Sequence, residues 1–108
     1  MLRTPLIRLQ VPECPAEIWL KLECLQPIGS FKIRGAANAI RSAPAGAVDR
    51  GVLTTSAGNM AQGVAWMARE LGVPATVVAP EHAPSAVGTL AAAVLPRVAV
   101  RWSCPAAT

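Results

Sequence analysis

The chain has 108 residues, enough for one small domain with a limited hydrophobic core. With 53% hydrophobic and 15% charged residues, it has the composition of a globular domain rather than of a disordered segment. The formal net charge of +4 comes mainly from arginines scattered along the sequence. Because they form no basic stripe, nucleic-acid binding is not expected.

Metal-binding and membrane functions find little support either. Cys14, Cys24 and Cys104 form no C-x-x-C pair, and His82 is the single histidine, so we expect no metal site and interpret the cysteines as free thiols. Charged residues and proline interrupt the first ten positions, unlike the apolar region of a signal peptide. The apolar stretch at 86–95 is too short to cross a bilayer. We therefore expect a cytoplasmic protein with no membrane partner.

Two short strands and a turn are predicted near the N-terminus. Residues 6–9 form an extended candidate after a Thr-Pro pair. Residues 18–22 place apolar side chains at every second position from Ile18, which predicts a half-buried strand. The proline and glycine at 26–29 indicate a turn.

A helix is predicted after this turn, with Ser30 as its N-cap. Its apolar residues recur at helical spacing on one face, namely Ile33, Ala36, Ala37 and Ile40. Proline and glycine within 42–46 end the helix.

A strand at 52–55, a helix at 60–71 and a strand at 75–79 follow. Asn59 is the predicted N-cap of the second helix, with Gln62 as its capping-box partner, and Gly72 suits the position after the helix. The predicted apolar stripe of that helix consists of Met60, Val64, Met67 and Leu71, beside the small residues Ala61, Ala65 and Ala68.

The alternation of strands and helices predicts an α/β fold with a parallel sheet. Beyond residue 85 the pattern degrades, although 91–95 has the composition of a short helix. We therefore interpret residues 1–85 as the domain and 86–108 as a divergent or truncated tail.

Lys32 is the first candidate for chemistry, because it lies in the first turn of a predicted helix. The helix dipole and the nearby Arg34 both disfavour a cation there, and so favour the neutral amine that attacks an aldehyde to form a Schiff base. The other lysine, Lys21, lies on the polar face of a predicted strand. Charge position alone favours a surface lysine at Lys32 over a reactive one.

The loop at 56–59 is the second candidate, because it joins the end of a strand to the start of a helix. Ligands of open parallel sheets bind at such loops, where backbone N–H groups suit a carboxylate or a phosphate. The stretch is neither a P-loop nor G-x-G-x-x-G. An ordinary capped turn explains the loop as well as an anion site does.

Two motifs in this order, GSFKIRG at 29–35 and SAGNMAQG at 56–63, resemble the N-terminal signatures of fold-type II pyridoxal-phosphate enzymes. The serine/threonine dehydratase family, which includes threonine ammonia-lyase and serine racemase, is the most similar group. Its pattern also matches RTPL at 3–6, WLKLECLQP at 19–27 and VPATVVAP at 73–80. The resemblance implies an incomplete three-layer parallel-sheet fold of the tryptophan synthase β-like type.

The resemblance also implies roles for individual residues. Lys32 would hold pyridoxal 5'-phosphate as a Schiff base and move protons at the substrate Cα. Phe31 would flank the cofactor, and Asn59 would bind its ring hydroxyl. The substrate carboxylate would be held by the loop Ser56, Ala57, Gly58, Asn59 and Met60. The implied reaction is deamination of L-threonine or L-serine by β-elimination, in an enzyme that is usually homo-oligomeric.

Five features bear on the alternatives. Racemases of this group tend to have serine at the position of Ala57, so alanine favours a dehydratase over a serine racemase. Met60 replaces the usual histidine, and residues after 85 depart from the family pattern. The sequence also lacks the glycine-rich phosphate cradle and the residue that faces the pyridine nitrogen. Another fold-type II activity, such as that of threonine synthase or cysteine synthase, and an inactive fragment therefore remain as alternatives.

Overall fold

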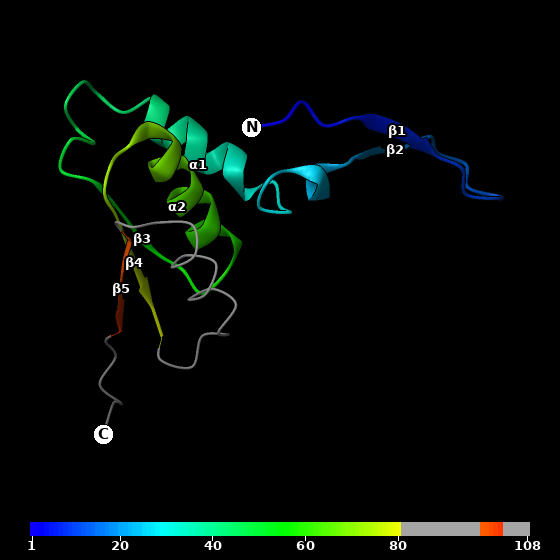
Figure 1. The fold of residues 1–108 in the computed structure, drawn as a ribbon. Coiled ribbons are helices and arrows are strands. Elements are labelled where there is room, and N and C mark those ends of the chain that lie inside the picture. The colour runs from blue at the N-terminus through cyan, green and yellow to red at the C-terminus, as the bar shows by residue number, and fades with distance from the viewer. Residues whose placement is uncertain (81–97, 103–108) are drawn as a thin grey trace.

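The computed structural model describes residues 1–80 and 98–102 (Figure 1). In chain order these residues form β1 (Leu6–Leu9), β2 (Ile18–Lys21), the 3-10 helix η1 (Glu23–Leu25), α1 (Lys32–Arg41), β3 (Val52–Thr55), α2 (Asn59–Leu71), β4 (Ala75–Ala79) and β5 (Val98–Trp102). No helix within this described part is long and apolar enough to cross a membrane.

Three of the strands form a parallel sheet in the order β3-β4-β5. Val52 pairs with Ala75, and Ala75 pairs with Val98. The helix α2 connects β3 to β4, so the predicted parallel α/β fold is confirmed. The strand β5 was not predicted and lies within the stretch interpreted as a tail, whereas the helix considered at 91–95 lies outside the described residues.

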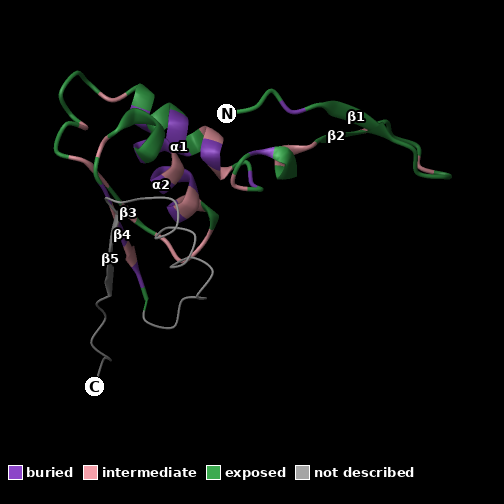
Figure 2. Ribbon diagram, in the orientation of Figure 1, coloured by how far each residue is buried: buried purple, intermediate pink, exposed green. Residues whose placement is uncertain are grey.

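The strands β1 and β2 form a separate antiparallel hairpin, with Leu6 opposite Lys21. The hairpin extends away from the helices and from the parallel sheet (Figure 1). The predicted half-buried face of β2 is only partly covered: Ile18 and Leu22 are partly buried, but Leu20 is 37% exposed, and the strand as a whole is mostly exposed (Figure 2). Alternation predicts which side chains share a face of a strand, but it does not reveal whether another layer covers that face.

The hydrophobic core has two parts, one between α1 and α2 and one between α2 and the parallel sheet. The predicted face of α1 is confirmed, because Ile33, Ala36, Ala37 and Ile40 are all buried. This face packs against Val64 and Met67 of α2. On another side of α2, Ala61 packs against Val77 of β4. Since α2 is buried between α1 and the sheet, it needs the small residues that the sequence places there.

The helix ends differ in part from the prediction. Gly72 adopts a φ of 69°, and the Val73 N–H donates to Ala68 O at 3.0 Å, as expected for a glycine that ends a helix. Neither predicted N-cap is confirmed: Phe31 precedes α1 and Gly58 precedes α2. Ser30 lies one residue too early, and Asn59 is already part of the helix.

The predicted apolar stripe of α2 is correct in its middle and wrong at its end. Val64 and Met67 are buried and Met60 is partly buried, but Leu71 is 44% exposed. Leu71 is the last residue of the helix, where it lies beyond the buried face.

Candidate active site

Lys32 is the first residue of α1, and a tight turn leads into it. The Gly29 N–H donates to Gln26 O at 2.7 Å, and Gly29 has a φ of 65°, a conformation that favours glycine. The buried Ser30 follows, and its Oγ accepts a hydrogen bond from the Lys32 N–H at 3.3 Å. The turn and this hydroxyl fix the backbone at Lys32.

The start of α1 lies directly against α2 at Gly63. A Cβ added at Gly63 would stand 3.3 Å from Ile33 N, Lys32 C and Lys32 O. Gly63 lies four positions after Asn59, which corresponds to about 6 Å along the helix axis. The backbone of Lys32 therefore lies about one helical turn from the N-terminus of α2.

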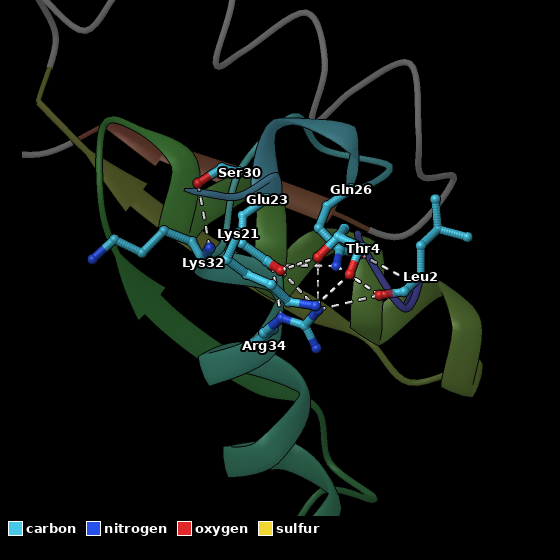
Figure 3. A network of polar contacts seen from close by, with 8 residues as sticks. All are labelled: Leu2, Thr4, Lys21, Glu23, Gln26, Ser30, Lys32 and Arg34. Carbon is cyan, nitrogen blue, oxygen red and sulfur yellow. Dashed lines mark hydrogen bonds and ion pairs between the residues drawn. The ribbon is translucent and has the colours of Figure 1, made fainter. Parts of the chain in front are cut away.

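The side chain of Lys32 is partly buried, and its Nζ lies 4.9 Å from the ring centroid of Phe31. The Phe31 ring itself is 59% exposed. No acidic group in the described part of the chain forms an ion pair with Lys32, whose side chain points away from the polar residues around Arg34 (Figure 3). The Lys32 amine and one face of the Phe31 ring thus lie side by side, and the amine forms no ion pair with the described residues.

Arg34 is paired with an acidic residue that the sequence analysis did not connect with it. Its Nε and Nη2 donate to the two carboxylate oxygens of Glu23 at 2.7 and 2.8 Å, in a bidentate ion pair (Figure 3). Hydrogen bonds from Arg34 and then from Thr4 lower the pKa of Glu23 to about 2. The charge of Arg34 is therefore balanced by Glu23.

Sequence reasoning missed the role of Glu23. The residue lies in the run at 19–27 that matches the family pattern, but no spacing rule connects it with Arg34, eleven positions further on. A buried threonine and a buried glutamine, Thr4 and Gln26, complete the group, and nothing in a single sequence marks them as buried.

The loop between β3 and α2 is anchored to the sheet and leads into a helix that no side chain caps. The Gly58 N–H donates to Ser56 Oγ at 3.1 Å, and the Ser56 N–H donates to Val78 O at 3.0 Å, so the loop is anchored to the sheet. No side chain in the described residues caps α2. Its first N–H groups are therefore available to a ligand.

The predicted site residues are only partly gathered. Ser56, Ala57 and Gly58 are partly buried in the loop, whereas Asn59 is exposed. Met60 packs against the core cluster between the helices. A hollow of about 440 Å³ lies instead at the end of the hairpin, lined by residues that include Arg8, Val11 and Glu17, and none of the predicted site residues line it.

The sequence of this chain matches a known protein family. Residues 1–95 match the family model described as pyridoxal-phosphate dependent enzyme. An L-threonine ammonia-lyase of Geobacter sulfurreducens is 57% identical over 67 residues, which cover 62% of this chain and 17% of that protein. The chain thus spans about a sixth of the length of this relative.

Solved structures agree with this family. The T.th. threonine deaminase has a TM-score of 0.74 at 39% identity, over 93% of this chain and 32% of that chain. Maize serine racemase has a TM-score of 0.76 at 30% identity, over 95% of this chain and 32% of that chain. Each match corresponds to about a third of the solved chain.

Proposed function

Because the chain belongs to the family of pyridoxal-phosphate-dependent enzymes, we propose that its site serves the deamination of L-threonine or L-serine to a 2-oxo acid and ammonia. The observation that carries the proposal is the contact at Gly63, which sets Lys32 beside the uncapped helix that begins at Asn59. The L-threonine ammonia-lyase and threonine deaminase among the relatives support this reaction.

The residues present fit pyridoxal phosphate. Lys32 offers an amine to the cofactor aldehyde, and Phe31 offers an aromatic face within reach of that amine. Asn59 would bind the ring hydroxyl with its amide. When bound, the cofactor supplies an electron sink for the substrate Cα. Lys32 would then move the proton at that carbon, since it is the only amine among the proposed site residues.

The loop from Ser56 to Met60 would hold the substrate carboxylate. Its contribution is the backbone N–H groups at the start of α2, since Met60 packs against the core and offers no polar atom suited to a carboxylate. The affinity for the carboxylate then depends on the shape of the loop, which the Ser56 hydroxyl holds at Gly58.

The position of Ala57 favours elimination over racemisation. A racemase needs a second acid/base group on the opposite face of the substrate Cα, and a methyl side chain cannot move a proton. Serine racemase is kept as the second candidate because the maize enzyme has a similar structure. We also propose that residues 1–85 form the N-terminal part of the dehydratase domain, in a cytoplasmic, homo-oligomeric protein.

Chemical trapping tests the role of Lys32. The chain is mixed with pyridoxal phosphate, reduced with borohydride, digested and examined by peptide mass spectrometry. We expect the cofactor mass on Lys32 and its loss in Lys32→Ala. Lys21→Arg is the matched control, because arginine keeps a cation that can reach the Thr4 carbonyl. Equal labelling of Lys21 and Lys32 in the unmodified chain would contradict the proposal.

Product assays separate the activities. Formation of 2-oxobutyrate from L-threonine supports the dehydratase, whereas D-serine from L-serine without 2-oxo acid supports the racemase. Labelling of Lys32 without either product indicates that this chain binds the cofactor but does not catalyse the reaction alone.

A further inference from the structure

Thr4, Glu23, Gln26 and Arg34 form one polar cluster beside the first turn of α1, which we call the clamp (Figure 3). We propose that the clamp is a positioning device that fixes the direction in which the Lys32 side chain leaves α1. This inference rests on the proposed function of Lys32.

Helix geometry connects the clamp with Lys32. Two residues along a helix correspond to a rotation of about 200°, so Arg34 and Lys32 leave α1 on nearly opposite sides. Figure 3 shows this arrangement, with Arg34 among the clamp residues and Lys32 pointing away from them. Because Glu23 accepts from both Nε and Nη2 of Arg34, it also restrains the rotation of the first turn, and that rotation sets where Lys32 points.

The first turn of α1 needs such a restraint. The helix has no acidic residue in its first turn, and its N-cap residue Phe31 offers no side-chain acceptor, so Ser30 Oγ, at 3.3 Å from the Lys32 N–H, is the side-chain acceptor at its start. It carries instead Lys32 and Arg34, two cations at the end of the helix where the dipole is unfavourable to them. Glu23 supplies the missing negative charge from outside the helix, and the ion pair adds to the restraint that the buried Ile33 places on the same turn.

The clamp also fastens the N-terminal segment to this turn. Gln26 donates to Leu2 O at 2.8 Å and accepts from the Leu2 N–H at 3.0 Å. Arg34 donates to the same carbonyl at 3.2 Å, and Lys21 donates to Thr4 O. Since Thr4 donates in turn to Glu23, loss of the Glu23 carboxylate removes the common acceptor of Thr4, Gln26 and Arg34.

The burial of α1 does not fix Lys32 by itself. The buried residues Ile33, Ala36, Ala37 and Ile40 set the distance between α1 and α2. Lys32 lies at the very end of this buried face, next to the contact at Gly63. The core therefore fixes the helix as a body, and the clamp fixes its terminal turn.

The test compares Glu23→Gln with Glu17→Gln. Glu17 pairs with Arg8 at 2.8 Å on the exposed hairpin, so its substitution removes the same charge far from Lys32. The readout is the rate at which pyridoxal phosphate becomes trapped on Lys32, with far-UV circular dichroism as the check on the fold. We expect E23Q to lower the rate about tenfold, within the cost of misplaced reacting groups, and E17Q to leave it unchanged.

Arg34→Lys extends the test, because it keeps the charge and loses the bidentate fork. We expect the trapping rate of R34K to lie between those of the unmodified chain and E23Q. If E23Q loses its helical signal, the rate of R34K alone tests the inference. Equal trapping rates in the unmodified chain and in the folded clamp variants would overturn the inference. So would an equal loss of rate in E17Q.

Hydrogen exchange separates this inference from the proposed function. If the unmodified chain shows no trapping at Lys32, the proposed function fails, and the amide exchange of residues 34–37 then decides the role of the clamp. Faster exchange there in E23Q than in E17Q supports the restraint of the first turn, whereas equal exchange overturns it.

Discussion

The contact between Gly63 and the start of α1 can be tested by adding one methyl group. In a helix interior, replacing glycine with alanine normally stabilises a protein by about 0.5–1 kcal/mol. At Gly63 the new Cβ would lie 3.3 Å from backbone atoms of Lys32 and Ile33, which cannot rotate away. Overpacking of this kind costs about 1–3 kcal/mol, so we expect Gly63→Ala to lower the free energy of unfolding.

Gly35→Ala is the matched control, because Gly35 lies within α1 and an added Cβ there meets nothing within 4 Å. We expect G35A to raise the free energy of unfolding by about 0.5–1 kcal/mol. Urea denaturation followed by far-UV circular dichroism measures both variants. G63A should also slow trapping of pyridoxal phosphate at Lys32. An equal gain in stability for both variants would refute the close approach of the two helices.

Three further predictions concern the core, the clamp and the hairpin. Ile33→Ala removes most of a fully buried side chain and should lower the free energy of unfolding, measured by urea denaturation, by about 2–5 kcal/mol. A loss of about 0.5 kcal/mol or less, as at an exposed position, would contradict the core assignment. The pKa of Glu23, about 2, is depressed from 4.5, so its contribution to stability is complete above pH 4.5 and is lost as the pH falls toward 2. Acid titration of unfolding should therefore show a decline in this window that is smaller in E23Q; identical profiles would exclude the effect. The exposed apolar hairpin should promote self-association, so Trp19→Ser should shift the sedimentation of the chain toward monomer, whereas a monomeric unmodified chain would contradict this.

Local patterns in the sequence predicted most of the elements. The strands at 6–9, 52–55 and 75–79 have the bounds that the structure gives them. The buried face of α1 followed from apolar residues at helical spacing, because a single stripe must pack against something. Lys32 could be singled out because the chain offers only one other lysine and because the motif at 29–35 surrounds it.

The remaining features depend on contacts between distant residues. The strand β5 pairs with β4, from which it is separated along the chain. Its residues alternate Val98, Val100 and Trp102 with Ala99 and Arg101, but this short pattern lies within the stretch interpreted as a tail. The exposure of β2 depends on the absence of a covering layer among the described residues. Arg34 was expected to act on Lys32, two positions away, because sequence reasoning weighs near neighbours; its partner is Glu23, on the element before the turn.

These differences divide the site into two parts. The amine, its helix and the loop at 56–60 are local features, so each could be identified from its own stretch of sequence. Their mutual placement depends on Gly63, where the missing side chain lets two backbones approach, and on Glu23, which holds the terminal turn from outside the helix. Lys32 and the loop alone therefore do not make the site. A chain that keeps both but loses Gly63 or Glu23 should have an amine that is no longer held in place beside the loop.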